Sequence, residues 1–323
     1  MLRISLLGKF SVTVDGVAVT GLESGKVQEL LGFLLVYRDR PHAREALAGS
    51  LWGECQSERS KKYLRQALWQ IQSALNRGGG RDVGILEIDT EWVRVRTDAS
   101  FWLDVAALET AFDRAKDVAG RNLSDQDISD VREAVRIYHG GLLEGSYADW
   151  CLIDRERYQH IYLLLLDKLM AACETRQAIE EGLEYGGRIL RVDPAREVTH
   201  RRMMVLHLLA DDRTGALRQY DRCQAELENE LGVTPSASTL RLFAQIREDL
   251  PLDQILAGGA ARPRTEPAPA VAPSLNEVLH QIHSLRWTLA ALQQQLEFAL
   301  QSPAVGASTP VRGDVPARGT FPA

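Results

Sequence analysis

Residues 60–76 read SKKYLRQALWQIQSALN, and this stretch decides the fold prediction. At 100° per residue its apolar side chains fall on one face, which is the spacing of a helix that buries one stripe. The opposite face carries cations, amides and a tryptophan but no carboxylate, and such donors bind phosphates and base edges. The stretch is a candidate DNA-recognition helix, although an ordinary solvated helix face is the alternative. The predicted buried residues are Leu64, Ala67, Leu68, Ile71 and Leu75.

Two sets of candidate DNA-contacting residues follow from this helix and the strands after it. Glutamine can pair with adenine through two hydrogen bonds, and guanidinium and ammonium groups neutralise phosphates. The candidates for base reading are Lys62, Arg65, Gln66, Trp69, Gln70 and Ser73. The candidates for phosphate binding are Arg59, Lys61, Arg77, Arg94 and Arg96.

The residues before this helix predict a small sheet and two further helices. Apolar and polar side chains alternate over residues 2–21, and Asp15-Gly16 is a tight-turn signal, so an antiparallel hairpin is expected. A helix is predicted over residues 26–37 with Ser24 as its cap, and a shorter helix over residues 42–53.

A hairpin follows the recognition helix. The glycines at 78–80 end the helix, and two strands are expected at 85–88 and 92–96. Arg94 and Arg96 fall on one face of the second strand, where they could meet phosphate. Three helices followed by a hairpin indicate a winged helix, whose third helix enters the major groove of DNA.

Composition limits the class of protein. The 323 residues are 45% hydrophobic and 25% charged, which is typical of a soluble protein with two or three domains. No run of 18 apolar residues occurs, so no membrane span is expected. The four cysteines are scattered, which suggests neither a zinc site nor disulfides and fits a reducing cytoplasm.

Charge and motifs separate binding from catalysis. The net charge is −6, but residues 1–103 hold 14 basic and 12 acidic side chains, so the relative positive charge lies beside the candidate recognition helix. Nucleotide-binding P-loop, HExxH and GxSxG patterns are absent from the sequence. We therefore expect no enzyme, no metal and no cofactor.

The chain after residue 100 is predicted to be helical. Helices are expected over 104–112, 127–138 and 158–175; the first is amphipathic and the last is a very apolar core helix. Gly182 and Ala216 are small residues 34 positions apart, each where two helices must meet closely. This period is typical of tetratricopeptide-like helix pairs, which stack and leave a surface for partners.

Several motifs carry a resemblance to a known family. The segments LRISLLGKFSVTVDG (2–16), REALAGSLWG (44–53) and YLRQALWQIQSAL (63–75) resemble the OmpR-like winged helix of the Streptomyces antibiotic regulatory protein family. Residues 199–239, which end in ELGVTPSAST, resemble the bacterial transcriptional activator domain that follows it in that family. Members often carry further arginines where this chain has Gln70 and Gln72.

The resemblance implies a bacterial transcriptional activator located at the nucleoid in the cytoplasm. It implies double-stranded DNA and RNA polymerase as partners. From the residues, an alternative is a protein-interaction adaptor whose winged helix no longer binds DNA. A third possibility, an effector ligand in the helical region, is compatible with the first.

The C-terminal residues predict self-association. Apolar residues step by three and four positions over more than three heptads, which favours a coiled coil between copies of the chain. Folding back onto the helical region is the alternative. The predicted seam contains Leu275, Val278, Ile282, Leu285, Leu289, Leu292 and Leu296.

The sequence thus predicts a mainly α protein in five segments. They are a winged-helix DNA-binding domain with small antiparallel sheets (1–98), a tetratricopeptide-like activator domain (99–252), a disordered Pro/Ala-rich linker (253–274), a coiled-coil helix (275–301) and a disordered tail (302–323).

Overall fold

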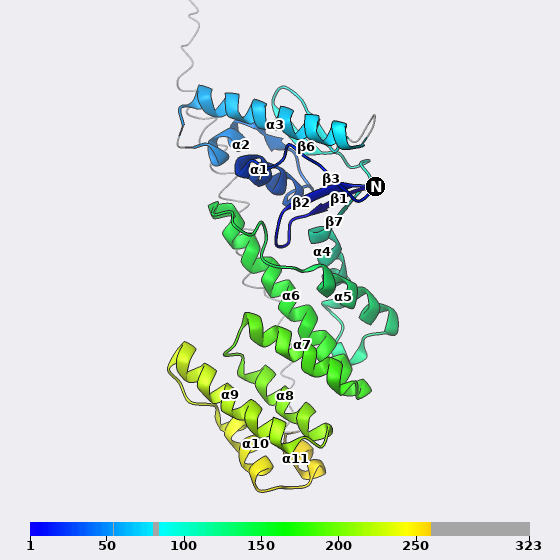
Figure 1. Ribbon diagram of the computed structural model, residues 1–323, viewed down its shortest axis with the longest axis vertical. Helices are drawn as coiled ribbons and strands as arrows, with labels where there is room; N and C mark the ends of the chain where they lie inside the picture. Colours follow the sequence, from blue (N-terminus) through cyan, green and yellow to red (C-terminus); the bar gives the residue numbers. More distant parts are fainter. Residues whose placement is uncertain (54, 80–83, 260–323) are drawn as a thin grey trace, which may run out of the picture.

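The structure, a computed structural model, describes residues 1–53, 55–79 and 84–259 (Figure 1). A winged helix lies at one end of the elongated molecule and paired helices lie at the other (Figure 1). The described part is mainly helical with small sheets in its N-terminal region, as predicted. The predicted coiled coil and tail, and residues 260–274 of the predicted linker, lie outside the described residues. Residues 253–259 were predicted to be disordered linker, but they belong to helix α11 (Leu252–Gly259), whose Ile255 is buried.

The chain opens with a four-stranded sheet in the order β3-β2-β1-β7. Asp15 and Gly16 both have positive φ, at 50° and 82°, so the predicted tight turn between β2 and β3 is present with the backbone twist that hairpins favour. The fourth strand is parallel to β1, so this sheet is mixed and not purely antiparallel. The strands are β1 (Leu2–Ser5), β2 (Ser11–Val14), β3 (Val17–Ala18) and β7 (Phe101–Leu103).

Three helices and a second sheet complete the winged helix. All five residues of the predicted stripe on α3 are buried, so the periodicity identified the inward face correctly. The elements are α1 (Gly25–Val36), β4 (His42–Ala43), α2 (Arg44–Leu51), α3 (Ser57–Gly79), β5 (Leu86–Ile88) and β6 (Trp92–Val95).

One local prediction in this region was wrong, and another was confirmed in position only. His42 and Ala43 were expected in a helix, but they form β4 and pair with Val93 and Trp92 of the wing. Ser24 occupies the N-cap position of α1, yet its side chain makes no capping hydrogen bond. In the first case a long-range strand pairing outweighs local helix propensity.

Helices make up most of the rest of the described chain. Helix α6 starts at Asp149, nine residues before its predicted beginning at residue 158. The later helices pack as antiparallel neighbours, α6 with α7 and α8 with α9 (Figure 1). The elements are α4 (Asp104–Ala115), η1 (Gly120–Asn122), α5 (Asp125–Ile137), α6 (Asp149–Arg176), α7 (Ile179–Val192), α8 (Glu197–Leu209), α9 (Arg213–Leu231), α10 (Ala237–Arg247) and α11 (Leu252–Gly259).

A single hydrophobic core runs from the winged helix to α8. Gly32 of α1 lets Leu143 approach so closely that a Cβ on residue 32 would lie 2.6 Å from its Cδ1 atom. The Tyr37 hydroxyl donates a 2.5 Å hydrogen bond to the buried carboxylate of Asp154 on α6. A separate, smaller core joins α8, α9, α10 and α11. The winged helix is therefore fixed to the first half of the helical region.

Asp104 is the first residue of α4, directly after β7, and it connects this point of the chain to the residues after β1. Its carboxylate accepts hydrogen bonds from the backbone N–H groups of Leu6, Leu7 and Val105 at 2.7–2.8 Å. Burial raises the pKa of this carboxyl to about 6, and the three hydrogen bonds oppose that rise. Because β7 pairs with β1, residues 101–103 belong to the N-terminal sheet although they lie beyond the boundary predicted after residue 98.

Candidate nucleic-acid interface

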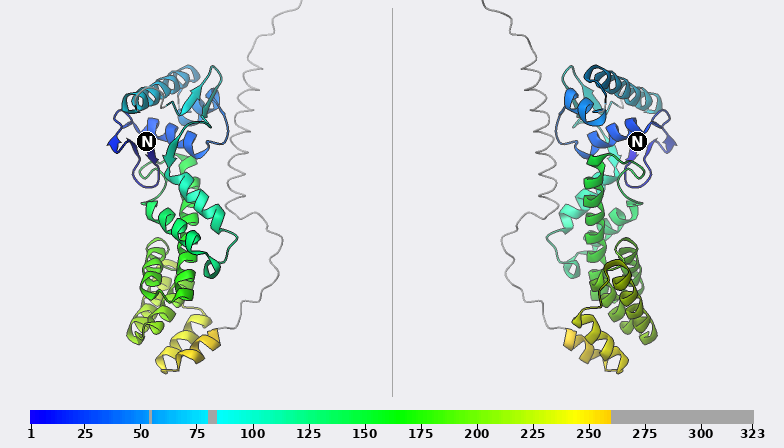
Figure 2. Two further views of the ribbon diagram at one scale, coloured as in Figure 1. Left: turned by 90° about the vertical axis from the view of Figure 1, so that its right-hand side faces the viewer. Right: turned by 90° about the vertical axis from the view of Figure 1, so that its left-hand side faces the viewer.

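Helix α3 crosses one end of the molecule, at the end opposite α9–α11 (Figures 1 and 2). Its outward face lies opposite the buried stripe. Neither Lys62 nor Arg65 forms an ion pair within the described residues. The nearest carboxylate along this face is that of Glu58, in the first turn. The exposed side chains of this face are Lys62, Arg65, Gln66, Trp69, Gln72 and Asn76.

Trp69 stands at the centre of this outward face. Its side chain is 68% exposed, which is unusual for the largest apolar side chain. Gln66 and Gln72 lie three positions before and after it, so both are its neighbours on the helix surface. The face therefore combines one apolar group, amides and cations, which are the groups that recognise base edges.

Gln70 does not belong to this outward face, which corrects its assignment as a base-reading residue. It lies 100° around the helix from Trp69 and is half-buried. Its side-chain amide donates a 2.7 Å hydrogen bond to the backbone oxygen of Gly21, in the loop after β3. Ser73 is also partly buried, although helical spacing places it on this face. The same spacing places Gln72 and Asn76 there, and both are exposed.

The phosphate candidates of α3 differ in their surroundings. Arg59 and Arg77 are exposed near the two ends of the helix, and Arg77 Nε donates to the backbone oxygen of Ser73 at 3.1 Å. Lys61 instead forms a 2.8 Å ion pair with Glu45 of α2. The hydrogen bond to Glu45 raises the pKa of Lys61, so this ammonium group connects α2 to α3.

The two arginines of the wing are both paired with carboxylates. Arg94 lies directly opposite Glu87 across the hairpin, and their side chains are 2.7 Å apart. Arg96 forms a 2.7 Å ion pair with Asp98, and this bond lowers the pKa of that carboxyl. Arg94 and Arg96 alternate with Val93 and Val95, which are buried on the inward side of the hairpin, so both arginines lie on its outward side. Binding of DNA phosphate by the wing would require these pairs to exchange partners.

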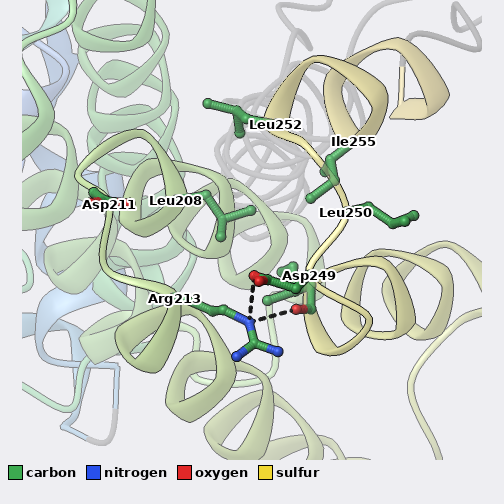
Figure 3. A pocket seen from close by; sticks show the side chains of 8 residues that line it. Leu208, Asp211, Arg213, Asp249, Leu250, Leu252 and Ile255 are labelled. Atoms are coloured by element: carbon green, nitrogen blue, oxygen red, sulfur yellow. Dashed lines mark hydrogen bonds and ion pairs between the residues drawn. The ribbon is translucent and has the colours of Figure 1, made fainter.

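A second possible site is a small cavity between α8, α9, α10 and α11 (Figure 3). It has a volume of about 150 Å³, which is below the 300–1,000 Å³ that is usual for small-molecule sites. Arg213 lies beside it, donates to the backbone oxygen of Ile246 and pairs with Asp249 at 3.2 Å. The cavity is therefore smaller than a usual effector pocket, and Arg213 connects α9 to α10 at its edge. The described residues contain no cluster of three His, Cys, Asp or Glu side chains that could hold a metal.

Residues 103–247 match the family described as the bacterial transcriptional activator domain. The transcriptional regulatory protein MoaR1 of Mycobacterium tuberculosis is 21% identical over 269 residues, which cover 82% of this chain and 85% of MoaR1. The chain contains a bacterial transcriptional activator domain and is similar to transcriptional regulatory proteins. These matches support the resemblance that the winged-helix and activator-domain motifs carry.

A second transcriptional regulator is similar over most of this chain. The transcriptional regulatory protein EmbR of Mycobacterium bovis is 24% identical over 270 residues, which cover 78% of this chain and 65% of EmbR. The solved structure of Mycobacterium tuberculosis EmbR in complex with a low-affinity phosphopeptide superposes with a TM-score of 0.57 at 21% identity, over 80% of this chain and 68% of that chain. At that identity the likeness shows the fold alone.

These relatives are regulators of transcription and not enzymes, in agreement with the class predicted for this chain. None of the described helices has the length and apolar composition needed to cross a membrane.

Proposed function

We propose that this regulator binds double-stranded DNA by placing the outward face of α3 in the major groove. Lys62, Arg65, Gln66, Trp69 and Gln72 would face base edges, and Arg59 and Arg77 would contact phosphates on either side. The single observation that carries this proposal is the outward face itself, whose Lys62 and Arg65 have no ion-pair partner within the described residues. Guanidinium or ammonium groups pair with guanine in the major groove and neutralise phosphates elsewhere.

The activator domain would act as a rigid arm behind the DNA-binding end. The continuous core and the Tyr37–Asp154 hydrogen bond support a fixed orientation between the two regions. A bound subunit would then present α7–α11 to neighbouring proteins at a defined angle. We propose RNA polymerase as that neighbour, and self-association through the heptads at 275–301 as the source of avidity, a segment outside the described residues.

An electrophoretic shift assay on genomic fragments tests this function with the full chain. We expect a specific complex at about 50 mM salt that weakens strongly at about 200 mM, because counterions are released on binding. Lys62→Ala should weaken the complex, whereas Arg222→Ala, an exposed change on α9, should not.

The pairing of the wing arginines favours a second candidate, the protein-interaction adaptor. Failure of the wild-type chain to bind any fragment at either salt concentration would support the adaptor and contradict DNA binding.

A further inference from the structure

Trp69 is exposed to solvent at the centre of the proposed DNA-contacting face. Its 68% exposed side chain interrupts an otherwise polar surface made of Lys62, Gln66, Gln72 and Asn76. Removing an aromatic side chain of this size from water releases favourable free energy. Nothing in the described chain packs over it, so that free energy is available only to a binding partner.

The charge around Trp69 indicates what kind of partner fits. Lys62 and Arg65 lie one to two turns before it, and the carboxylate of Glu58 lies three turns away. A protein partner with an apolar pocket would need to be strongly acidic to cover these cations. The major groove of DNA is polyanionic at its rims and offers an apolar group at its floor, the C5-methyl of thymine.

The two glutamines beside Trp69 indicate a preference for the same type of base pair, A·T. An exposed glutamine side chain can bind adenine through its N6 and N7 atoms. Every adenine in a duplex faces a thymine, so an A·T pair presents an acceptor–donor edge for Gln66 or Gln72 and a methyl group for Trp69. The opposite arrangement, a tryptophan against the amino group of cytosine, would leave that donor covered and without an acceptor.

We propose that Trp69 recognises the C5-methyl group of thymine, so that α3 selects A·T pairs beneath its centre. This inference rests on the proposed DNA binding and adds its base preference. It assigns Trp69 as a specificity-determining residue, with Gln66 and Gln72 as the adenine-reading residues on either side.

Replacement of thymine by uracil tests the contact, because uracil lacks only the methyl group. A bound genomic fragment is shortened to the minimal duplex, and each thymidine is changed singly to deoxyuridine. Wild-type protein should lose about fourfold in affinity at one or two positions, which corresponds to one buried methyl at 1.4 kcal/mol per tenfold. Trp69→Ala should bind the thymine and uracil duplexes equally at those positions.

Matched variants distinguish the possible outcomes. Trp92→Ala removes another exposed tryptophan, from the wing, and should keep the wild-type preference for thymine. Wild-type binding that tolerates uracil everywhere would overturn the inference while leaving DNA binding intact. A uracil penalty that persists in Trp69→Ala would overturn it too, as would unchanged DNA binding by that variant, which would assign Trp69 to a protein partner. Absence of any specific complex would instead contradict the proposed function.

Discussion

Helix α3 and the wing both present basic side chains, but they present them in different states. Lys62 and Arg65 on α3 have no carboxylate partner within the described residues, whereas Arg94 and Arg96 on the wing are paired with Glu87 and Asp98. The helix is held by a fully buried apolar stripe, and its ion pair with α2 uses Lys61 rather than Lys62 or Arg65. The wing is a short hairpin, and the Arg94–Glu87 pair across its strands helps to stabilise it.

This difference shows that basic residues counted in the sequence are not equally available to DNA. An exposed ion pair contributes about 0–1 kcal/mol, so a phosphate can displace it, but the exchange reduces the net gain. We infer that α3 supplies most of the affinity and that the wing adds little until its carboxylates are neutralised. The predictions below test that division, beginning with the largest expected effect.

Arg65→Ala should have the largest effect on DNA affinity. A well-formed arginine–base pair contributes about 1–3 kcal/mol, so the dissociation constant should rise roughly 5- to 150-fold. Fluorescence anisotropy with a labelled specific duplex measures it, with Arg222→Ala as the control for loss of a distant exposed charge. A change in the dissociation constant below twofold would mean that α3 does not supply most of the DNA affinity.

Glu87→Gln combined with Asp98→Asn should strengthen binding. Each change removes a carboxylate that competes with phosphate, and each should raise the affinity by up to about fivefold. The plot of log affinity against log salt should steepen by about one unit for each arginine that reaches a phosphate. Unchanged affinity and slope would show that the wing stays away from the DNA.

Arg94→Ala and Arg96→Ala should cost less than Arg65→Ala in the wild-type background. We expect about threefold or less for each, because the carboxylate partner already offsets part of the phosphate attraction. In the Glu87→Gln, Asp98→Asn background the same changes should cost more. An equal cost in both backgrounds, measured in one double-mutant cycle, would disprove competition within the wing.

Gln70→Ala should have the smallest effect on DNA binding, below twofold, because its amide is hydrogen-bonded to Gly21. The loss should appear in stability instead, as a decrease of about 0.5–1.5 kcal/mol in the free energy of unfolding by urea. Gln66→Ala is the matched control, since it is exposed on the outward face and should reverse the pattern. Weaker DNA binding by Gln70→Ala with unchanged stability would restore it as a base-reading residue.

The sequence predicted the winged helix and the helical region because their signals are local and repeated. The Asp15-Gly16 turn and the stripe on α3 each follow from the geometry of a few neighbouring residues. Strand β4 was missed, and β7 was assigned to the following domain, because their pairing partners lie far away in the sequence.

The candidate site was predicted in part for the same reason. A helix turns 100° per residue whatever surrounds it, so the sequence by itself determined which face of α3 is buried and which is left for a partner. Tertiary structure alone decided three contacts. Gln70 donates a hydrogen bond to Gly21, Lys61 forms an ion pair with Glu45, and β4 pairs with strand β6 of the wing. These contacts depend on how α3, the loop after β3 and the hairpin dock together, and docking is set by packing across the whole core rather than by the periodicity of any one segment.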